Sequence, residues 1–104
     1  MSSPTQRSLK LMRERGFHAE VVERWIPGAN IRRDLFGFID ILCLGDSGEL
    51  VGVQSTSASN VAARLTKIAE SPLVGRVRNA GIRILVHGWK KVKGRWQVRE
   101  VDVS

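Results

Sequence analysis

The sequence predicts a single α/β domain, residues 1–104, in which helices flank a mixed central sheet in the order α-β-β-β-α-β-β. Two segments carry this prediction. Residues 35–44, "LFGFIDILCL", and residues 49–55, "ELVGVQS", are apolar at successive positions, which is typical of strands covered on both faces. Amphipathic helical patterns lie before and after this pair. A chain of 104 residues is long enough for one core without disulfides or structural metals.

The first two elements follow from local patterns. Residues 4–15 predict a helix, because proline suits its first turn, Leu9 and Met12 share a face, and a glycine follows. The alternation of residues 17–26 predicts a strand, which includes Trp25. The sequence "PGAN" ends this strand.

The turn between the two apolar segments fixes their register. "DSG", residues 46–48, suits a three-residue hairpin loop whose third residue is left-handed, a position that glycine favours. Gly45 then pairs with Glu49, and the numbers of every facing pair sum to 94. Asp40 therefore falls opposite Gln54, on the same face of the sheet.

The second half of the chain supplies a helix and two strands. Residues 56–70 predict a helix with an apolar stripe of Val61, Leu65 and Ile68, which Pro72 ends. A short helical turn, a strand, a turn and a final strand follow at residues 73–81, 82–89, 91–95 and 96–103.

The charge of the chain is asymmetric. Residues 1–63 hold seven basic and seven acidic residues, whereas residues 64–104 hold ten and three, which accounts for the net charge of +7. Such asymmetry favours a nucleic-acid partner over a basic surface that serves solubility alone. The turn in "WKKVKGRW" argues against a membrane helix, and the two tryptophans either stack on bases or pack in the core. The expected contacts to nucleic acid are Arg32, Arg33, Arg64, Lys90, Lys91, Lys93 and Arg95.

A carboxylate inside an apolar strand is costly unless a hydrogen bond, an ion pair or a metal compensates it. Asp40 is such a residue, and either Arg32 or Arg33 pairs with it or it belongs to a functional site. Gly52 shares the face of Asp40 and Gln54 and is expected to leave open space beside the acid. An acid, a gap and an amide on one face of a central hairpin point to a site.

The pattern "FGFIDIL…ELVGVQST" and the element order resemble the PD-(D/E)XK nuclease superfamily, in its branch of small phage and archaeal Holliday-junction resolvase-like proteins. The resemblance implies a restriction-endonuclease-like fold and a Mg²⁺ or Mn²⁺ site. Asp40 matches the metal-binding aspartate of that superfamily, and Gln54 matches its lysine position. Gly52 stands where a second carboxylate is usual. Asp34 is the leading replacement, and the others are Glu14, Glu20 and Glu23.

The resemblance also implies chemistry for the site. Phosphodiester hydrolysis needs a hard cation held by carboxylates. Gln54 can hydrogen-bond the attacking water but carries no charge, so Lys67 or Arg64 is expected to supply it. His87 is interpreted as a structural residue rather than a general base, and the single Cys43 as a buried hydrophobic residue rather than a nucleophile. His18 has no companion at metal-ligand spacing, which argues against a zinc site.

The leading hypothesis is a metal-dependent DNA endonuclease or junction resolvase, acting as a homodimer. One alternative is a nucleic-acid-binding module of the same fold that has lost catalysis, and another is a phage-type assembly protein. The N-terminus lacks the apolar block of a signal peptide, which predicts a cytoplasmic location.

Overall fold

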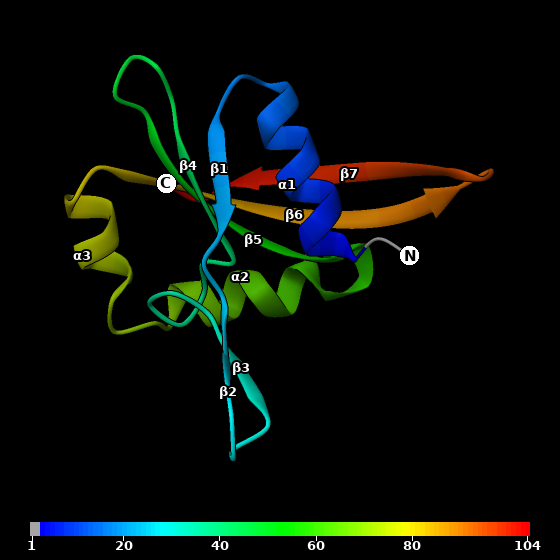
Figure 1. Ribbon diagram of the computed structural model, residues 1–104. Helices are drawn as coiled ribbons and strands as arrows, with labels where there is room; N and C mark the ends of the chain where they lie inside the picture. Colours follow the sequence, from blue (N-terminus) through cyan, green and yellow to red (C-terminus); the bar gives the residue numbers. More distant parts are fainter. Residues whose placement is uncertain (1–2) are drawn as a thin grey trace.

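The computed structural model describes residues 3–104 and contains one five-stranded sheet with the strand order β1-β4-β5-β6-β7 (Figure 1). Strands β5 and β6 are parallel and the other neighbours are antiparallel, so the predicted mixed α/β fold is confirmed. The helices are α1 (Pro4–Glu14), the 3-10 turn η1 (Ala58–Asn60), α2 (Val61–Ala69) and α3 (Val74–Asn79). The strands are β1 (His18–Val21), β2 (Arg24–Ile26), β3 (Ile31–Arg33), β4 (Ile41–Leu44), β5 (Leu50–Ser57), β6 (Ile82–Val92) and β7 (Arg95–Asp102).

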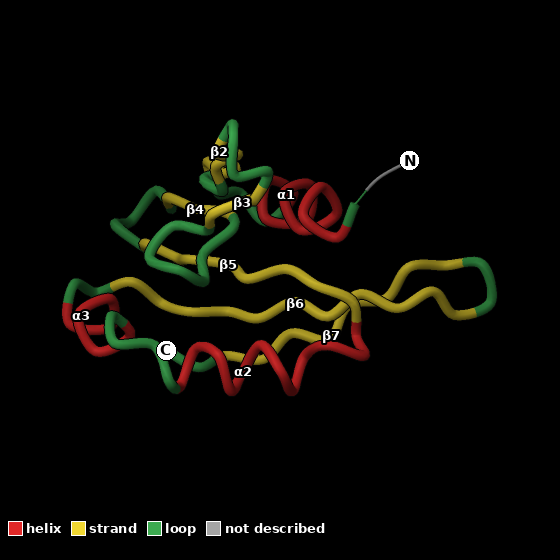
Figure 2. The backbone as a smooth tube through the Cα atoms, turned by 90° about the horizontal axis from the view of Figure 1, so that it is seen from below, coloured by secondary structure: helices red, strands yellow, loops and turns green. Residues whose placement is uncertain are grey.

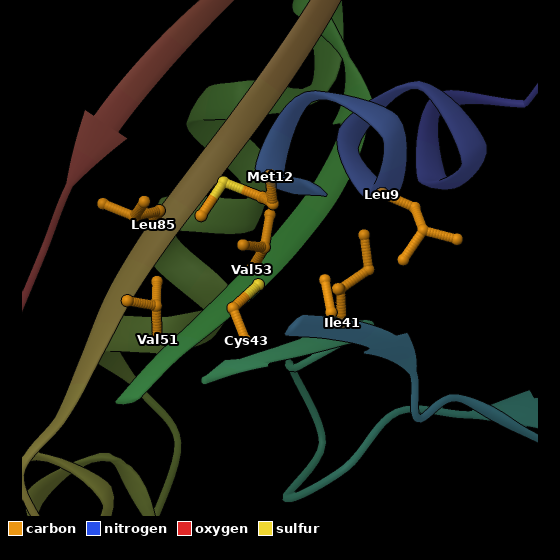
Figure 3. Packing of buried hydrophobic residues seen from close by; sticks show 8 residues of the cluster. Leu9, Met12, Ile41, Cys43, Val51, Val53 and Leu85 are labelled. Carbon is orange, nitrogen blue, oxygen red and sulfur yellow. The ribbon is translucent and has the colours of Figure 1, made fainter. Parts of the chain in front are cut away.

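The sheet is covered on both faces, with α1 on one side and α2 and α3 on the other (Figure 2). This arrangement explains why β4 and β5 lack polar–apolar alternation. The core under α1 contains Leu9, Met12, Ala19, Ile41, Cys43, Val51, Val53 and Leu85 (Figure 3). The core under α2 and α3 contains Phe38, Ile39, Val61, Ile68, Val77, Ile84 and Val86.

The predicted register of the central hairpin is confirmed. The backbone N–H of Gly45 donates to the carbonyl of Glu49 at 2.8 Å, and Ile41 pairs with Val53, so the facing numbers sum to 94. Gly48 has φ +87°, the left-handed conformation that the turn requires of its third residue.

The expected single strand over residues 17–26 is wrong. Strand β1 pairs with the four residues of β4. The last hydrogen bond between the two segments runs from the N–H of Val22 to the carbonyl of Asp40, the residue before β4. The chain then leaves the sheet, and β2 pairs with β3 in a separate hairpin that projects from the body (Figure 1). Trp25 therefore lies in β2, half exposed, instead of on the face of β1.

The expected strand over residues 35–44 begins only at Ile41. The preceding residues form a tight loop in which Leu35 and Ile39 bridge each other, with φ +55° at Phe36 and +84° at Gly37. Two successive positive φ angles reverse the chain, so an extended strand cannot run through them. Asp40 consequently lies one residue before β4, and the loop brings Asp34 back toward it.

Strands β6 and β7 continue beyond the body as a two-stranded arm (Figure 1). The arm ends in a two-residue turn at Lys93 and Gly94, whose φ angles of +50° and +80° are those of a type I′ turn. The turn is thus shorter than the five residues expected, and both strands are longer. The basic residues of "WKKVKGRW" lie on this arm.

Candidate metal centre

Three carboxylates meet where the β2–β3 hairpin joins the sheet. Glu23 lies between β1 and β2, Asp34 follows β3, and Asp40 precedes β4. Each offers one oxygen, and these oxygens lie within 4.8 Å of one another. The predicted ligands Asp40 and Asp34 are therefore adjacent, and Glu23 is the third member among the described residues.

The other two candidate acids lie elsewhere. Glu14 is exposed on α1 and pairs with Lys10 at 4.0 Å, and Glu20 is exposed on β1 beside His18. The sequence offered no means of choosing among the three glutamates. The choice depends on the path by which the chain leaves β1, because Glu23 is the glutamate beyond the end of that strand.

Asp40 is only 3% exposed and is held by β5. Its Oδ2 accepts hydrogen bonds from Gln54 Nε2 and from the backbone N–H of Ser55, both at 2.8 Å. The predicted proximity of Asp40 and Gln54 is confirmed. The expected alternative, an ion pair with Arg32 or Arg33, is wrong: Arg32 reaches Glu23 instead, at 3.4 Å, and Arg33 is exposed on β3 and forms no ion pair with Asp40.

Two of the three acids have a cation nearby, Arg32 at Glu23 and Lys67 at Asp34, each at 3.4 Å, whereas Asp40 forms no ion pair within residues 3–104. Burial, the largest cause, and a hydrogen bond with Asp34 together raise the pKa of Asp40 to about 8, against the opposing effect of the Ser55 N–H. The charges of Asp34 and Glu23 act in the same direction. Asp40 therefore retains a proton at neutral pH unless a cation compensates the three acids.

The donor set fits a hard divalent cation. Carboxylate oxygens are the ligands that Mg²⁺ and Mn²⁺ take, and Mg²⁺–oxygen bonds of about 2.0–2.1 Å place two ligands at most about 4.2 Å apart. The carboxylate oxygens lie within 4.8 Å of one another, so a movement of less than about 1 Å would bring them to the spacing of Mg²⁺ ligands. Gln54 adds a buried Oε1 that has no hydrogen-bond partner within residues 3–104. This oxygen shares a carbon with the Nε2 that binds Asp40, so it lies beside the cluster and can accept from a water molecule.

Helix α2 brings a cation to the edge of the cluster. Its buried Ile68 fixes the helix against the sheet, and Nζ of the neighbouring Lys67 lies 3.4 Å from Asp34 Oδ2. Lys67 is partly exposed, so it can also reach a ligand from solvent. Arg64 lies one turn earlier on the same side of α2, half-buried. The predicted catalytic residues Asp40, Gln54 and Lys67 thus surround one site.

Gly52 does not leave the expected space. A Cβ atom at this position would lie 2.7 Å from Cδ1 and 3.0 Å from Cγ1 of Ile39, a fully buried side chain. The loop before β4 folds Ile39 over the glycine, which the linear strand expected for residues 35–44 could not anticipate. The two carboxylates that lie near Asp40, Glu23 and Asp34, come from the two ends of the β2–β3 hairpin.

The predicted nucleic-acid contacts fall on three surfaces. Arg32 and Arg33 are exposed on β3, beside the carboxylates, and Arg64 lies on α2. The remaining four are exposed on the β6–β7 arm: Lys90, Lys91, Lys93 and Arg95.

The two tryptophans of the arm have different environments. Trp89 is half-buried, and its Nε1 donates to Ser8 Oγ at 2.9 Å. Trp96 is 45% exposed, and the Arg7 guanidinium lies 3.3 Å from its ring centroid. The ring of Trp96 is thus accessible for contact with a ligand, whereas Trp89 is part of the packing under α1.

A second polar cluster, under α1, is structural. His87 is fully buried, and its Nδ1 and Nε2 lie 2.8 Å from Ser8 Oγ and 2.7 Å from Glu100 Oε2. Trp89 and Glu100 fix the protons, because an indole N–H can only donate and a carboxylate can only accept. Neutral His87 then donates from Nε2 to Glu100 and accepts from Ser8 at Nδ1. Ser8 has no solvent-accessible surface, so its hydroxyl cannot reach a substrate and does not serve as a nucleophile.

The buried histidine predicts acid sensitivity. Burial lowers the pKa of His87 from 6.5, against the opposing effect of Glu100, so the fold favours the neutral ring. The unfolded chain then binds more protons, and stability is lost as the pH falls from about 6.5 toward the lowered pKa. We expect the melting temperature of the unmodified protein to fall relative to that of His87→Gln as the pH is lowered from 7.5 to 5.5. His18→Gln is the control, because His18 is exposed. Equal pH profiles for His87→Gln and the unmodified protein would contradict this assignment.

Comparison of the chain with protein-family models, with curated proteins and with solved structures gave no match. The geometry of the site is therefore the basis on which a function can be proposed. Among residues 3–104, no helix has the length and apolar character needed to cross a membrane.

Proposed function

We propose that the protein is a divalent-metal-dependent endonuclease that hydrolyses phosphodiester bonds in DNA. The observation that carries the proposal is the convergence of Glu23, Asp34 and Asp40 within 4.8 Å beside a lysine. Three acids cost free energy when they are brought together without a compensating cation. The element order and the pairing of Asp40 with Gln54 support the same proposal through the resemblance to PD-(D/E)XK nucleases.

Each residue of the cluster has a separate role. The three carboxylates hold Mg²⁺ or Mn²⁺, which supplies Lewis-acid stabilisation of the phosphate and of its attacking water. Gln54 Oε1, which is buried without a partner in the described chain, accepts a hydrogen bond from that water and so orients it. Lys67, whose Nζ is held by Asp34, compensates the charge that develops on the phosphate oxygens.

The basic surfaces suit a long polyanion. Arginines stand on the β2–β3 hairpin next to the carboxylates, and lysines stand on the β6–β7 arm, which projects in a different direction (Figures 1 and 2). We propose that DNA contacts both, and that two copies of the chain act together, as the resemblance implies. The direct test is a titration of Mg²⁺ and of Mn²⁺ with branched, single-stranded and duplex DNA. Absence of cleavage on all three substrates would refute the nuclease.

One observation favours a second candidate, a binding module that does not cut. The position at which the resemblance places a carboxylate, Gly52, is filled by Ile39, and Gln54 Nε2 is engaged by Asp40. Absence of the usual acid and lysine is what a degenerate nuclease would show. Salt-dependent DNA binding without cleavage in either metal would select this candidate.

Binding should weaken steeply with salt under both candidates, because lysines and arginines displace condensed counterions when they contact phosphates. We expect Lys90→Gln, Lys91→Gln and Lys93→Asn together to lower duplex affinity whatever the sequence. The slope of log K against log salt should become shallower by about 0.9 for each phosphate that the variant no longer neutralises. Asparagine is chosen at residue 93 because it tolerates φ +50°. Fluorescence anisotropy at several salt concentrations measures both quantities.

The control for the lysine variant is Arg76→Gln. Arg76 is exposed on α3, which lies just before the start of β6, whereas the arm is at the end of that strand. An unchanged slope in the triple variant would remove the arm from the interface.

A further inference from the structure

The β2–β3 hairpin has no evident structural role of its own. Its two strands pair only with each other and project from the body (Figures 1 and 2). A hairpin of this size is marginally stable in isolation, because it has no face to bury. All of its strand residues are exposed except Ile26, which is partly buried.

The register sorts these side chains onto two faces. Trp25 pairs with Arg32, whereas Arg24 pairs with Arg33 and Ile26 pairs with Ile31. Directly opposite residues project to the same face, and successive residues alternate. Trp25 and Arg32 therefore share one face, and the other two pairs share the opposite one.

The face of Trp25 and Arg32 continues into the carboxylate cluster. Glu23 is two residues before Trp25 and Asp34 is two residues after Arg32, so alternation places both acids on this face. The 3.4 Å contact between Arg32 and Glu23 agrees with that placement. Two residues of strand span about 6.6 Å, so the backbone of Trp25 lies about that far from the backbone of Glu23.

The chemistry of this face suits a nucleobase. Trp25 is 52% exposed, and the Arg32 side chain is 68% exposed, so a flat ring and a planar cation stand side by side in solvent. Aromatic rings stack on any base, and arginine adds a cation–π or phosphate contact. Inside a duplex the faces of each base are covered by its neighbours. Only an unpaired base can offer a face to Trp25.

We propose that Trp25 and Arg32 form a stacking platform for an unpaired base next to the phosphate that a cation at Glu23, Asp34 and Asp40 would bind. The preferred nucleic acid then carries an unpaired nucleotide beside the cleaved bond, as in a flap, a gap or a single strand. The cleavage part of this inference rests on the proposed function, whereas the binding part does not.

The chain offers a matched control for the test. Ile31 is on the same hairpin, is also 52% exposed, and lies on the opposite face. Affinity is measured by fluorescence anisotropy without added metal, on an oligothymidine, on a duplex with a central gap and on an intact duplex. We expect Trp25→Ala to weaken binding to the first two by about 5- to 100-fold, the usual range for one stacked base. Intact duplex should be bound within about twofold of the unmodified protein. Trp25→Phe should restore most of the affinity, and Ile31→Ala should leave all three affinities nearly unchanged.

Other outcomes separate this inference from the proposed function. Equal weakening on all three nucleic acids, no weakening on any, or failure of the unmodified protein to bind single strands or gaps would overturn the platform. If Trp25→Ala shows the selective weakening but Mg²⁺ and Mn²⁺ support no cleavage, the platform stands and the nuclease falls. If DNA is cut but Trp25→Ala binds and cuts normally, the nuclease stands and the platform falls.

Discussion

Asp40→Asn is expected to lower the rate of cleavage by about 100-fold or more, because a bound metal ion lowers the barrier to phosphoryl transfer by several kcal/mol. The fold should survive, since an asparagine oxygen can still accept from Gln54 Nε2 and from the N–H of Ser55. Metal binding can be measured separately, as the rise in melting temperature on adding Mn²⁺. The unmodified protein should show this rise, and Asp40→Asn should lose most of it. Glu70→Gln, at an exposed acid following α2, should behave like the unmodified protein.

The same variant tests the electrostatics without metal. The pKa of Asp40 is raised to about 8, so the fold holds a proton that the unfolded chain releases above about pH 4. Metal-free stability from this group therefore declines as the pH rises from about 4 to about 8. Asp40→Asn should lack that decline. A variant that retains cleavage, or that keeps all of its metal-induced stabilisation, would exclude Asp40 as a ligand.

Gly52→Glu is expected to disrupt the fold and not to restore a metal ligand. The new Cβ would lie 2.7 Å from Cδ1 of the fully buried Ile39, so the packing around Ile39 has to shift. Overpacking of this kind costs about 1–3 kcal/mol, and an unpaired buried carboxylate adds several more. A domain of this size is stabilised by only about 5–15 kcal/mol in total. Urea unfolding should show the destabilisation, and cleavage should fall with the folded fraction.

Smaller substitutions isolate the steric part of this prediction. Gly52→Ala alone should cost about 1–3 kcal/mol, and adding Ile39→Val should recover part of that cost by removing the clashing Cδ1. Gly75→Ala is the control, because nothing lies within 4 Å of a Cβ there. A folded Gly52→Glu protein with increased activity would mean that Ile39 can leave the site and that the glutamate binds metal.

Local chemistry determined much of this fold. The glycine of "DSG" fixed the register of β4 and β5, because a three-residue turn needs a left-handed residue at its third position. That register placed Asp40 next to Gln54 before any tertiary contact was known. The same holds for burial. The amphipathic stripes of α1 and α2 predict one buried face each, and the uninterrupted apolar run of β5 predicts a strand that is covered on both faces.

Contacts between distant segments decided the rest of the site. The sequence of residues 17–26 predicts one strand. Strand β4 nevertheless pairs with only four of these residues, so the chain leaves the sheet at Glu23. That departure selects Glu23 over Glu14 and Glu20 and creates the β2–β3 hairpin. The turn through Phe36 then returns Asp34 to Asp40 and presses Ile39 onto Gly52. The periodicity of a sequence predicts which face of an element a residue occupies. The length of the neighbouring strand and the side chain that fills the space at Gly52 depend instead on how the whole molecule packs. The sequence by itself therefore determined helices α1 and α2, the register of β4 and β5 and the Asp40–Gln54 pair, and only the tertiary structure brought three carboxylates and Lys67 together.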